Sequence, residues 1–507
     1  MEIDNPCLRK NNKAKGNNMK LIDLLYNLDY EIVLGDLNKN IEKLVYDSRK
    51  VAKGDAFVCI SGAVRDAHDF VSDVAIKGAT AIVVEKDIDL SNLRNVTVIK
   101  VKDTRYALAC MAAAYFKHPA EKLITIGITG TKGKTTTTYM VKSILDKIGM
   151  KTGLIGTIET IIGDTHIPSC NTTPESYIVQ ETFAKMVEEG CKCVVMEVSS
   201  QAMKLHRVAG FVFDYGVFTN LSKDHIGPNE HKDFNEYLNC KAALFRQCKN
   251  GIFNVDDEHT KDILEKATCK VETFGIDNEA DYKAENIKLF TKPGCLGISY
   301  DLKGKINIPV EIDIPGRFSV YNSLTAIAIC NHFTNDYKLI EAVLSDIRVK
   351  GRVEIIPVSP KYTLMIDYAH NAMSLESLLK CIREYHPKRI VTMFGCGGNR
   401  DRNRRFEMGE VSSRLSDLTV VTSDNPRFEE PEAIIEDIIT GVKKADGKYI
   451  TIPDRKEAIK YVIENGEEGD IIILAGKGHE DYQEIKGVKY PMDERDIISD
   501  IKKMLNM

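Results

Sequence analysis

The sequence predicts an α/β protein of three domains, and three observations support this. A chain of 507 residues is too long for one hydrophobic core. Strand-like apolar runs alternate with helical patterns, as in mostly parallel sheets covered by helices. A glycine-rich turn at 130–136 follows an apolar strand and opens a helix, as phosphate-binding loops do. We therefore expect a small N-terminal α/β domain, a central P-loop ATPase-like domain with a mostly parallel sheet, and a C-terminal Rossmann-like α/β domain.

The first predicted domain covers residues 19–119. Residues 1–18 are rich in Asn and Lys without an apolar pattern, which indicates a disordered extension or an upstream start. Strand-like runs at 55–60 and 79–84 flank a helical pattern at 68–77. Ser48 and Arg49 can hold a phosphate or uridine on a loop, or they can simply form a turn.

The second predicted domain, 120–350, contains the phosphate-binding pattern. Residues 123–129 read as a buried strand, the glycines at 130 and 133 let the backbone N–H groups turn inward, and Lys134 and Thr135 open a helix. The spacing departs from GxxxxGK(S/T), because Ile128 stands where the first glycine is usual. The alternative is a glycine-rich turn that binds nothing.

Polar side chains follow the next strands of this domain. We expect strands at 193–197, 215–220 and 251–255, and a helix at 235–245. Thr135 and Glu197 could supply the hydroxyl and carboxylate that Mg²⁺ on a triphosphate needs, and His225 could hold a second ion. As isolated residues, Glu197 and His225 would be structural. Residues 282–313 alternate as a small antiparallel section, and a helix containing Asn322 follows.

The third predicted domain, 351–507, carries four unusual polar turns. They follow strands expected at 363–366, 390–394, 418–422 and 471–475. Ligands of open parallel sheets bind beyond the carboxyl ends of the strands. We therefore expect a ligand site at this edge.

Composition excludes several other classes of protein. A net charge of -5 and a pI near 6.2 leave no broad basic surface for nucleic acid. No apolar run is long enough for membrane insertion, and the N-terminus lacks a signal-peptide pattern. Thirteen cysteines are scattered without a CxxC motif, which indicates reduced residues and no zinc site. We expect a cytoplasmic protein.

Several motifs together resemble the Mur ligase family, from Met19 onward. They are Gly130–Thr136, Asn171–Pro174, Glu197–Ser200, Asn220–His225 and Asp367–Asn371. Asp47–Arg49, Ser423–Arg427 and Gly476–Gln483 further resemble the UDP-N-acetylmuramoyl-tripeptide synthetases. Within them, Asp424–Arg427 resembles the form found in the diaminopimelate-adding type. Two departures affect substrate contacts: Leu205 stands where glutamine is common, and Gly227-Pro228 follows His225.

The resemblance implies ATP-dependent amide-bond formation in peptidoglycan precursor synthesis. The D-glutamate carboxylate of UDP-N-acetylmuramoyl-L-alanyl-D-glutamate would attack the γ-phosphate of ATP, and an amine of meso-diaminopimelate would displace phosphate from the acyl phosphate. Lys134 and two Mg²⁺ would neutralise charge, and Lys241 would carry a CO₂-derived carbamate beside the metals. We expect a monomer whose domains close over these small-molecule substrates, with no nucleic acid or membrane partner.

The resemblance also assigns site residues. Catalytic and metal-binding roles fall on Lys134, Thr135, Glu197, His225 and carbamylated Lys241. ATP would contact Gly130, Thr131, Lys132, Gly133, Lys134, Thr135, Thr136, Asn322, Arg352, Asp367 and His370. The UDP substrate would contact Ser48, Arg49, Thr172, Thr173, Ser199 and Arg207. Diaminopimelate would contact Arg400, Asp424, Asn425, Pro426, Arg427, Gly476 and Glu480.

Arg427 is expected to select the amino acid. Its guanidinium suits the distal carboxylate of diaminopimelate, and Glu480 could pair with the distal ammonium. Binding of lysine would leave Arg427 buried and unpaired. A site built to bind a substrate group can discriminate by about 10⁴-fold against a substrate that lacks this group. Arg427 could instead be a surface residue after an Asn-Pro turn. The alternatives for the whole chain are a lysine-adding synthetase, a folylpolyglutamate synthetase-like ligase and a nucleotide-dependent binding switch that forms no bond.

Overall fold

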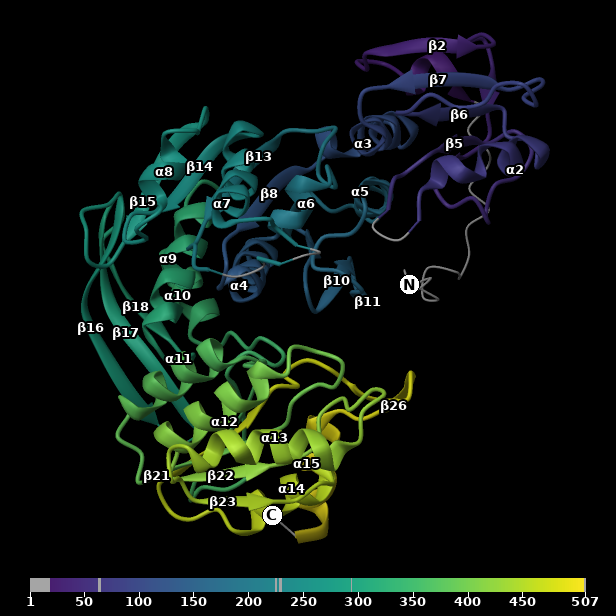
Figure 1. Cartoon of the computed structure of the whole chain (residues 1–507). Coiled ribbons are helices and arrows are strands. Elements are labelled where there is room, and N and C mark those ends of the chain that lie inside the picture. Colours follow the sequence, from purple (N-terminus) through teal and green to yellow (C-terminus); the bar gives the residue numbers. More distant parts are fainter. Residues whose placement is uncertain (1–18, 63–64, 224–225, 228–229, 293, 506–507) are drawn as a thin grey trace. The chain divides into compact units, whose positions relative to one another are not determined.

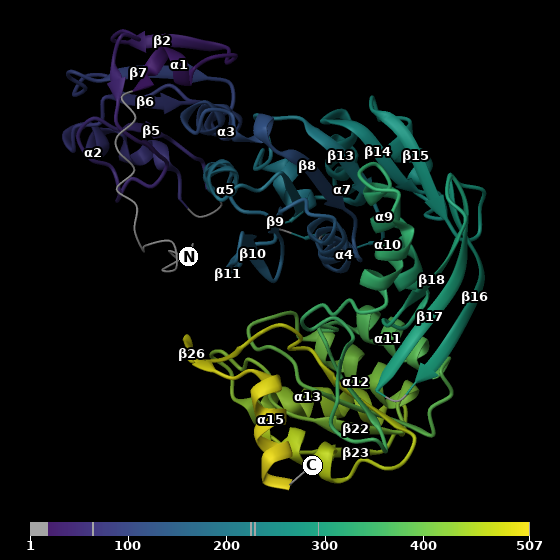
Figure 2. The ribbon, with the colours of Figure 1, turned by 180° about the vertical axis from the view of Figure 1, so that it is seen from behind.

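The structure is a computed structural model that describes residues 19–62, 65–223, 226–227, 230–292 and 294–505. The chain divides into two compact units (Figures 1 and 2). The first unit runs to Tyr282 and includes Leu324–Asn335, and the second comprises Lys283–Ser323 and the chain from Asp336 onward. Each unit is described separately below.

The first unit begins with a five-stranded sheet in the order β2-β7-β6-β5-β4. All neighbours are parallel except β2 and β7. Apolar clusters on this sheet bury side chains from α1, α2 and α3. The elements are β1 (Met19–Lys20), α1 (Leu21–Leu24), β2 (Tyr30–Leu34), β3 (Asn40–Ile41), β4 (Leu44–Val45), β5 (Ala56–Val58), α2 (Val71–Ile76), β6 (Ala81–Val84), β7 (Thr97–Val101) and α3 (Thr104–Tyr115).

A second sheet of the first unit has the order β11-β10-β9-β12-β8-β13-β14-β15. From β9 to β15 the neighbouring strands are parallel, and the hairpin β10–β11 is antiparallel. The elements are β8 (Ile124–Thr129), α4 (Lys134–Lys147), β9 (Thr152–Ile155), β10 (Glu159–Ile162), β11 (Thr165–Pro168), α5 (Ser176–Glu188), β12 (Cys193–Glu197), α6 (Ser200–Lys204), β13 (Phe213–Phe218), α7 (Phe234–Ala242), β14 (Cys248–Asn254), α8 (Thr260–Leu264) and β15 (Lys270–Gly275).

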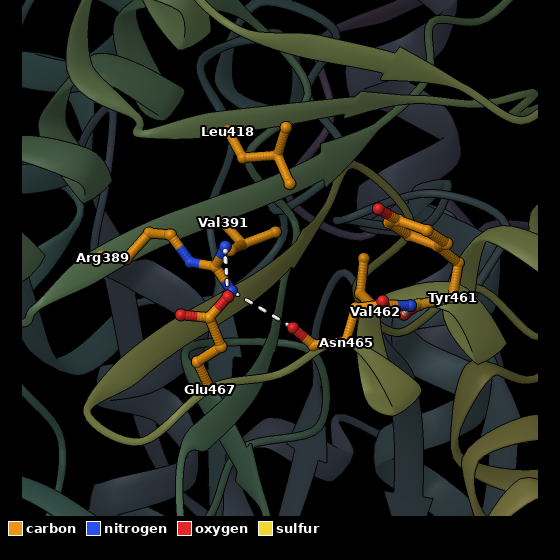
Figure 3. A pocket seen from close by; sticks show the side chains of 7 residues that line it. All are labelled: Arg389, Val391, Leu418, Tyr461, Val462, Asn465 and Glu467. Atoms are coloured by element: carbon orange, nitrogen blue, oxygen red, sulfur yellow. Dashed lines mark hydrogen bonds and ion pairs between the residues drawn. The ribbon is translucent and has the colours of Figure 1, made fainter.

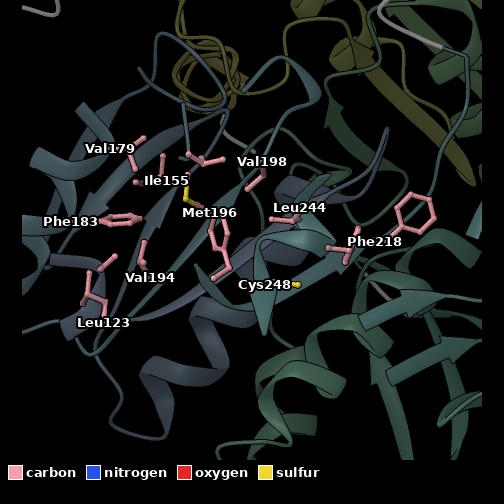
Figure 4. Close-up of a cluster of buried hydrophobic side chains, with 14 of the residues drawn as sticks. Leu123, Ile155, Val179, Phe183, Val194, Met196, Val198, Phe218, Leu244 and Cys248 are labelled. Atoms are coloured by element: carbon pink, nitrogen blue, oxygen red, sulfur yellow. The ribbon is translucent and has the colours of Figure 1, made fainter. Parts of the chain in front are cut away.

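The core of this second sheet surrounds β8. Phe183 of α5 and Val194 and Met196 of β12 are fully buried in a cluster that extends to Phe218 and Leu244 (Figure 4). A Cβ on Gly127 of β8 would lie 2.9 Å from the Phe213 ring, so this central strand is closely packed. The phosphate-binding pattern therefore begins on a rigid strand.

The second unit contains three long strands and a six-stranded sheet of order β19-β20-β24-β21-β22-β23. In the six-stranded sheet only β19 is antiparallel to its neighbour. The elements are β16 (Tyr282–Lys292), β17 (Cys295–Gly304), β18 (Ile308–Ile312), α9 (Arg317–Cys330), α10 (Tyr337–Leu344), β19 (Glu354–Ile356), β20 (Thr363–Asp367), α11 (Ala372–Arg383), β21 (Arg389–Phe394), α12 (Asn403–Leu415), β22 (Leu418–Val421), α13 (Pro431–Lys443), β23 (Tyr449–Thr451), α14 (Arg455–Glu464), β24 (Asp470–Ala475), β25 (Tyr482–Ile485), β26 (Val488–Pro491) and α15 (Glu494–Leu505). Helix α9 joins the two units in sequence.

The predicted fold class is confirmed, with local differences. The strand expected at 215–220 is β13, Phe213–Phe218, because Thr219 and Asn220 turn away to bond the glycine-rich loop. The helix expected at 235–245 changes after Ala242 into a 3₁₀ turn, Ala243–Arg246. The helix expected at 68–77 likewise begins as a 3₁₀ turn, Ala67–Phe70. Within the described residues, no helix combines the length and apolar character needed to cross a membrane.

Candidate active site

The glycine-rich loop lies against the end of the neighbouring strand β13. A Cβ on Gly130 would lie 1.9 Å from Thr219 Oγ1, so no larger residue fits there. Gly133 has φ 87° and directly precedes α4, a conformation that favours glycine. The unusual glycine spacing thus follows from close backbone packing at Gly130 and a left-handed turn at Gly133.

Asn220 holds the loop by three hydrogen bonds. Its side-chain oxygen accepts from Lys132 N at 2.9 Å, and its amide group donates to Lys132 O at 3.1 Å. Its backbone carbonyl accepts from Thr131 N at 2.9 Å. Asn220 begins the motif Asn220–His225, and its sequence alone predicts no role for it. In the structure it fixes the backbone that would surround a phosphate.

Two lysines meet at the carbonyl oxygen of Gly130. Lys134 Nζ and Lys241 Nζ each donate to this oxygen at 2.8 Å. Lys241 is buried on α7, 4.8 Å above the Tyr237 ring, and the Tyr237 hydroxyl lies 3.0 Å from Thr131 Oγ1. Lys241 is therefore not a solvated helix lysine. Two ammonium groups at one oxygen make this position attractive to an anion.

Glu197 ends β12 as a buried carboxylate. Its two oxygens accept from Thr157 N at 2.8 Å and from Thr157 Oγ1 at 3.0 Å. Across the described part of the chain, no lysine, arginine or histidine pairs with it. A buried carboxylate without a basic partner suits a divalent cation.

Among the residues that the structure describes, acidic, histidine and cysteine side chains do not form a complete metal site by themselves. The described ranges contain no cluster of three such side chains. His225, predicted to hold a second ion, lies outside the described residues. Thr135, the predicted hydroxyl ligand, is buried in the first turn of α4. Together with Glu197 and a carbamate on Lys241, it would supply the oxygen donors that Mg²⁺ prefers.

Four of the six residues predicted for the UDP substrate form one group. Thr173 Oγ1 donates to the carbonyl of Glu197 at 2.8 Å and accepts from Ser199 N at 3.1 Å. Arg207 donates to Thr173 O at 3.0 Å. Thr172 Oγ1 lies 3.0 Å from Thr157 Oγ1, beside the same carboxylate.

Ser48 and Arg49 occupy a turn of the N-terminal sheet. Arg49 donates through Nε and Nη2 to Asp47, at 2.9 and 2.8 Å, and its side chain is 80% exposed. The Ser48 carbonyl accepts from Lys77. Turn chemistry, the alternative for these residues, is therefore present, and the substrate role stays a prediction.

The remaining predicted ATP contacts belong to the second unit. Asp367 accepts from Val353 N and Ala369 N, both at 2.8 Å, and burial raises the pKa of its carboxyl group. The Arg352 guanidinium lies 4.8 Å from the Tyr368 ring centroid, and His370 Nδ1 lies 2.8 Å from Tyr368 O. Asn322 is buried on α9.

Most residues predicted for the amino acid converge on Lys477, which the sequence analysis did not single out. This lysine is fully buried, and its Nζ donates to Asn425 Oδ1 at 2.7 Å and lies 3.4 Å from Glu480 Oε2. Asn425 Nδ2 donates to the same Glu480 oxygen at 2.9 Å. Burial and the charge of Asp424 raise the pKa of Glu480. A Cβ on Gly476 would lie 3.2 Å from the Asp424 carboxylate, so this glycine belongs to the group.

Arg427 already has partners, which corrects one expectation. Its Nε donates to Glu484 at 3.1 Å and its Nη1 donates to the carbonyl of Gly398 at 2.7 Å. The side chain is half-buried, so it would not be left unpaired without a substrate carboxylate. The reason is that strand β25 pairs with the Arg427 backbone and brings Glu484 alongside. Two of its five donors are used, so others remain for a ligand.

Arg400 and Pro426 flank this group. A Cβ on Gly397 would lie 3.0 Å from Arg427 Nη1 and 3.9 Å from Arg400 Cγ, so both arginines border Gly397. Arg400 is exposed, whereas Pro426 is buried.

A separate cavity of about 120 Å³ lies at the amino ends of strands β21 and β22 of the same sheet (Figure 3). Arg389 and Leu418, which line it, are the first residues of β21 and β22. Ligands of parallel sheets bind at the carboxyl ends of strands, where the polar turns lie. This cavity is therefore not the amino-acid site.

Comparisons with known proteins agree with this geometry. Residues 40–116 match the model "Mur ligase family, catalytic domain", residues 128–330 the "Mur ligase middle domain", and residues 351–478 the "Mur ligase, glutamate ligase domain".

Two curated relatives match nearly the whole chain. UDP-N-acetylmuramoyl-L-alanyl-D-glutamate--2,6-diaminopimelate ligase 1 of Clostridium acetobutylicum is 43% identical over 96% of this chain and 100% of its own length. The corresponding ligase of Clostridium perfringens is 41% identical over 95% of this chain and 99% of its own length.

A solved structure with that same ligase name superposes with a TM-score of 0.70 at 26% identity. It covers 97% of this chain and 100% of the solved one. The phosphate loop, its lysines and the full-length similarity lead to one conclusion: the chain belongs to the Mur ligase family.

Proposed function

We propose that this chain joins meso-diaminopimelate to UDP-N-acetylmuramoyl-L-alanyl-D-glutamate at the expense of ATP, in peptidoglycan precursor synthesis. The observation that carries the proposal is the contact of buried Lys241 with the Gly130 carbonyl, because a loop that only hydrolysed a nucleotide would not need a lysine from another helix beside Lys134. The relatives that match the whole chain carry the name of this ligase.

The residues of the first unit would prepare the carboxylate for attack. A carboxylate is a poor acyl donor, and phosphorylation converts its departing oxygen into phosphate. The attacking carboxylate and the γ-phosphate are both negative, so their approach requires neutralisation. Lys134 and the backbone N–H groups fixed by Asn220 would hold the phosphates. The UDP-linked peptide would be oriented by Thr172, Thr173, Ser199 and Arg207.

Two Mg²⁺ ions would be held by Thr135, Glu197, His225 and a carbamate on Lys241. Carbamate formation turns a cation at this position into an anion, which removes repulsion between Lys241 and a metal. When bound, the ions would supply positive charge that stabilises the phosphoryl group during transfer. We expect the reaction in the cytoplasm, where ATP is available, and a monomeric enzyme.

The residues of the second unit would bind the amino acid. Arg427 would use its remaining donors for the distal carboxylate of diaminopimelate, with Arg400 beside it. Glu480 would accept the distal ammonium in place of its bond to Lys477. ATP would contact Asn322, Arg352, Asp367 and His370.

The substrate assignment predicts a clear preference in a turnover assay. The purified chain is incubated with ATP, Mg²⁺ and the UDP-linked dipeptide, with either meso-diaminopimelate or L-lysine, and ADP release is measured. We expect turnover with diaminopimelate to exceed that with lysine by at least about 100-fold. Faster turnover with lysine would contradict the role of Arg427, and no turnover with either would contradict the ligase assignment.

Replacement of Lys241 tests the metal-site proposal. Lys241→Ala should lower substrate-dependent ADP release by at least about 100-fold, because the carbamate that would hold the metal is lost. The matched control is Lys249→Ala, since Lys249 is 64% exposed and its ion pair among the described residues is with Asp214. Full activity of the Lys241→Ala enzyme would count against the proposed site.

Replacement of Arg427 tests amino-acid selection. Arg427→Ala should raise the KM for diaminopimelate by roughly 100-fold and leave the KM for ATP unchanged, because a charge-assisted contact is lost only to the amino acid. Arg414→Ala is the control, because Arg414 is half exposed and bonds Glu376 on the surface of the same unit. An equal rise in both KM values would show that Arg427 supports the fold rather than the substrate.

A further inference from the structure

A buried ion pair lies beneath the two turns that form the amino-acid pocket. Arg455 opens α14 and Glu494 opens α15, and their side chains are 1% and 0% exposed. Arg455 Nε donates to Glu494 Oε1 at 2.9 Å. Neither residue belongs to the sites predicted from sequence, and Glu494 lies beyond the part of the chain that matches the family models.

The same guanidinium also bonds the ends of two strands. Arg455 Nη1 donates to Ser423 O at 3.2 Å, and Nη2 donates to Ala475 O at 3.1 Å. Ser423 immediately precedes Asp424, and Ala475 immediately precedes Gly476. One planar group therefore links the starts of both turns of the pocket, and its rigid fork fixes their separation.

The surrounding contacts strengthen this link. The carbonyl of Pro453, two residues before Arg455, accepts from Ser423 N at 3.1 Å. Next to Glu494, Arg495 donates to Gly478 O at 2.9 Å and is bonded to Glu354. The first turn of α15 thus supports the second pocket turn at two points.

Stability alone is a poor explanation of this pair. Removing two charges from water is energetically costly, and buried ion pairs can often be replaced by apolar residues without loss of stability. Glu494 Oε2 is buried without a hydrogen-bond partner among the described residues, which adds to the cost. What Arg455 provides and an apolar side chain cannot is a pair of hydrogen bonds to the carbonyls of Ser423 and Ala475.

We propose that Arg455 and Glu494 are positioning residues for the amino-acid substrate. Arg455 holds the ends of β22 and β24 at the separation that places Asn425 and Glu480 on one ligand, and Glu494 fixes the guanidinium. This inference rests on the proposed function, since the pocket is that of the diamino acid.

The test is the double variant Arg455→Met/Glu494→Leu, assayed with ATP, the UDP-linked dipeptide and diaminopimelate. We expect the KM for diaminopimelate to rise about tenfold, because small misplacements of binding groups are costly, while the KM for ATP stays unchanged. The control is Arg389→Met/Asp470→Leu, an ion pair at 2.6 Å at the other ends of β21 and β24. It should leave the KM for diaminopimelate unchanged.

Three outcomes would overturn the inference: an unchanged KM for diaminopimelate, an equal rise in both KM values, or the same selective rise in the control. If the double variant does not fold, Arg455→Lys decides, because lysine keeps the positive charge beside Glu494 but lacks the rigid planar fork that sets the separation of the two carbonyls. For Arg455→Lys, a rise of less than about tenfold in the KM for diaminopimelate, with the KM for ATP unchanged, would support the inference. An unchanged KM for diaminopimelate would overturn it. Activity of the unaltered chain with diaminopimelate is measured in parallel, so failure of the proposed function is recognised separately.

Discussion

The carbonyl oxygen of Gly130 is the point on which the site of the first unit depends. Lys134 from α4 and Lys241 from α7 both donate to it, and Thr219 from the end of β13 packs against the same glycine. The helix that follows the loop and two segments about 90 to 110 residues further along the chain are thereby fixed around Gly130. Both ammonium groups therefore lie at one carbonyl oxygen, a position that attracts an anion. We propose that a triphosphate and a carbamate on Lys241 supply this negative charge.

The charged side chains in the polar turns of the second unit form ion pairs with one another. The pocket turns contain several charges, and most are already paired: Lys477 with Glu480, and Arg427 with Glu484. These pairs satisfy the charges of the turns within the protein itself. They also mean that selectivity for a diamino acid would come from an exchange of partners rather than from relief of an unpaired arginine. We therefore expect discrimination against lysine to be smaller than a simple count of lost contacts suggests.

Local sequence patterns predicted the strands and their polar ends well, because apolar strands and glycine-rich turns depend on near neighbours. The strand at Cys193–Glu197 is an example. Contacts between distant segments could not be predicted in this way. Lys241 looks like an ordinary helix lysine, and only the family resemblance pointed to it. Lys477 and Glu484 were missed because their partners lie on another turn, more than 50 residues away in sequence. Arg455 and Glu494 were missed because their partners lie on other elements, 20 to 39 residues away in sequence.

The central claim is that the chain forms an amide through an acyl phosphate made at the Gly130 loop. Isotope transfer tests it most directly. The UDP-linked dipeptide is prepared with oxygen-18 in the glutamate side-chain carboxylate, turnover is run with ATP and diaminopimelate, and the released phosphate is analysed by mass spectrometry. The account predicts that oxygen-18 appears in the phosphate, because the carboxylate oxygen leaves with it. Unlabelled phosphate accompanied by full amide formation would contradict the account.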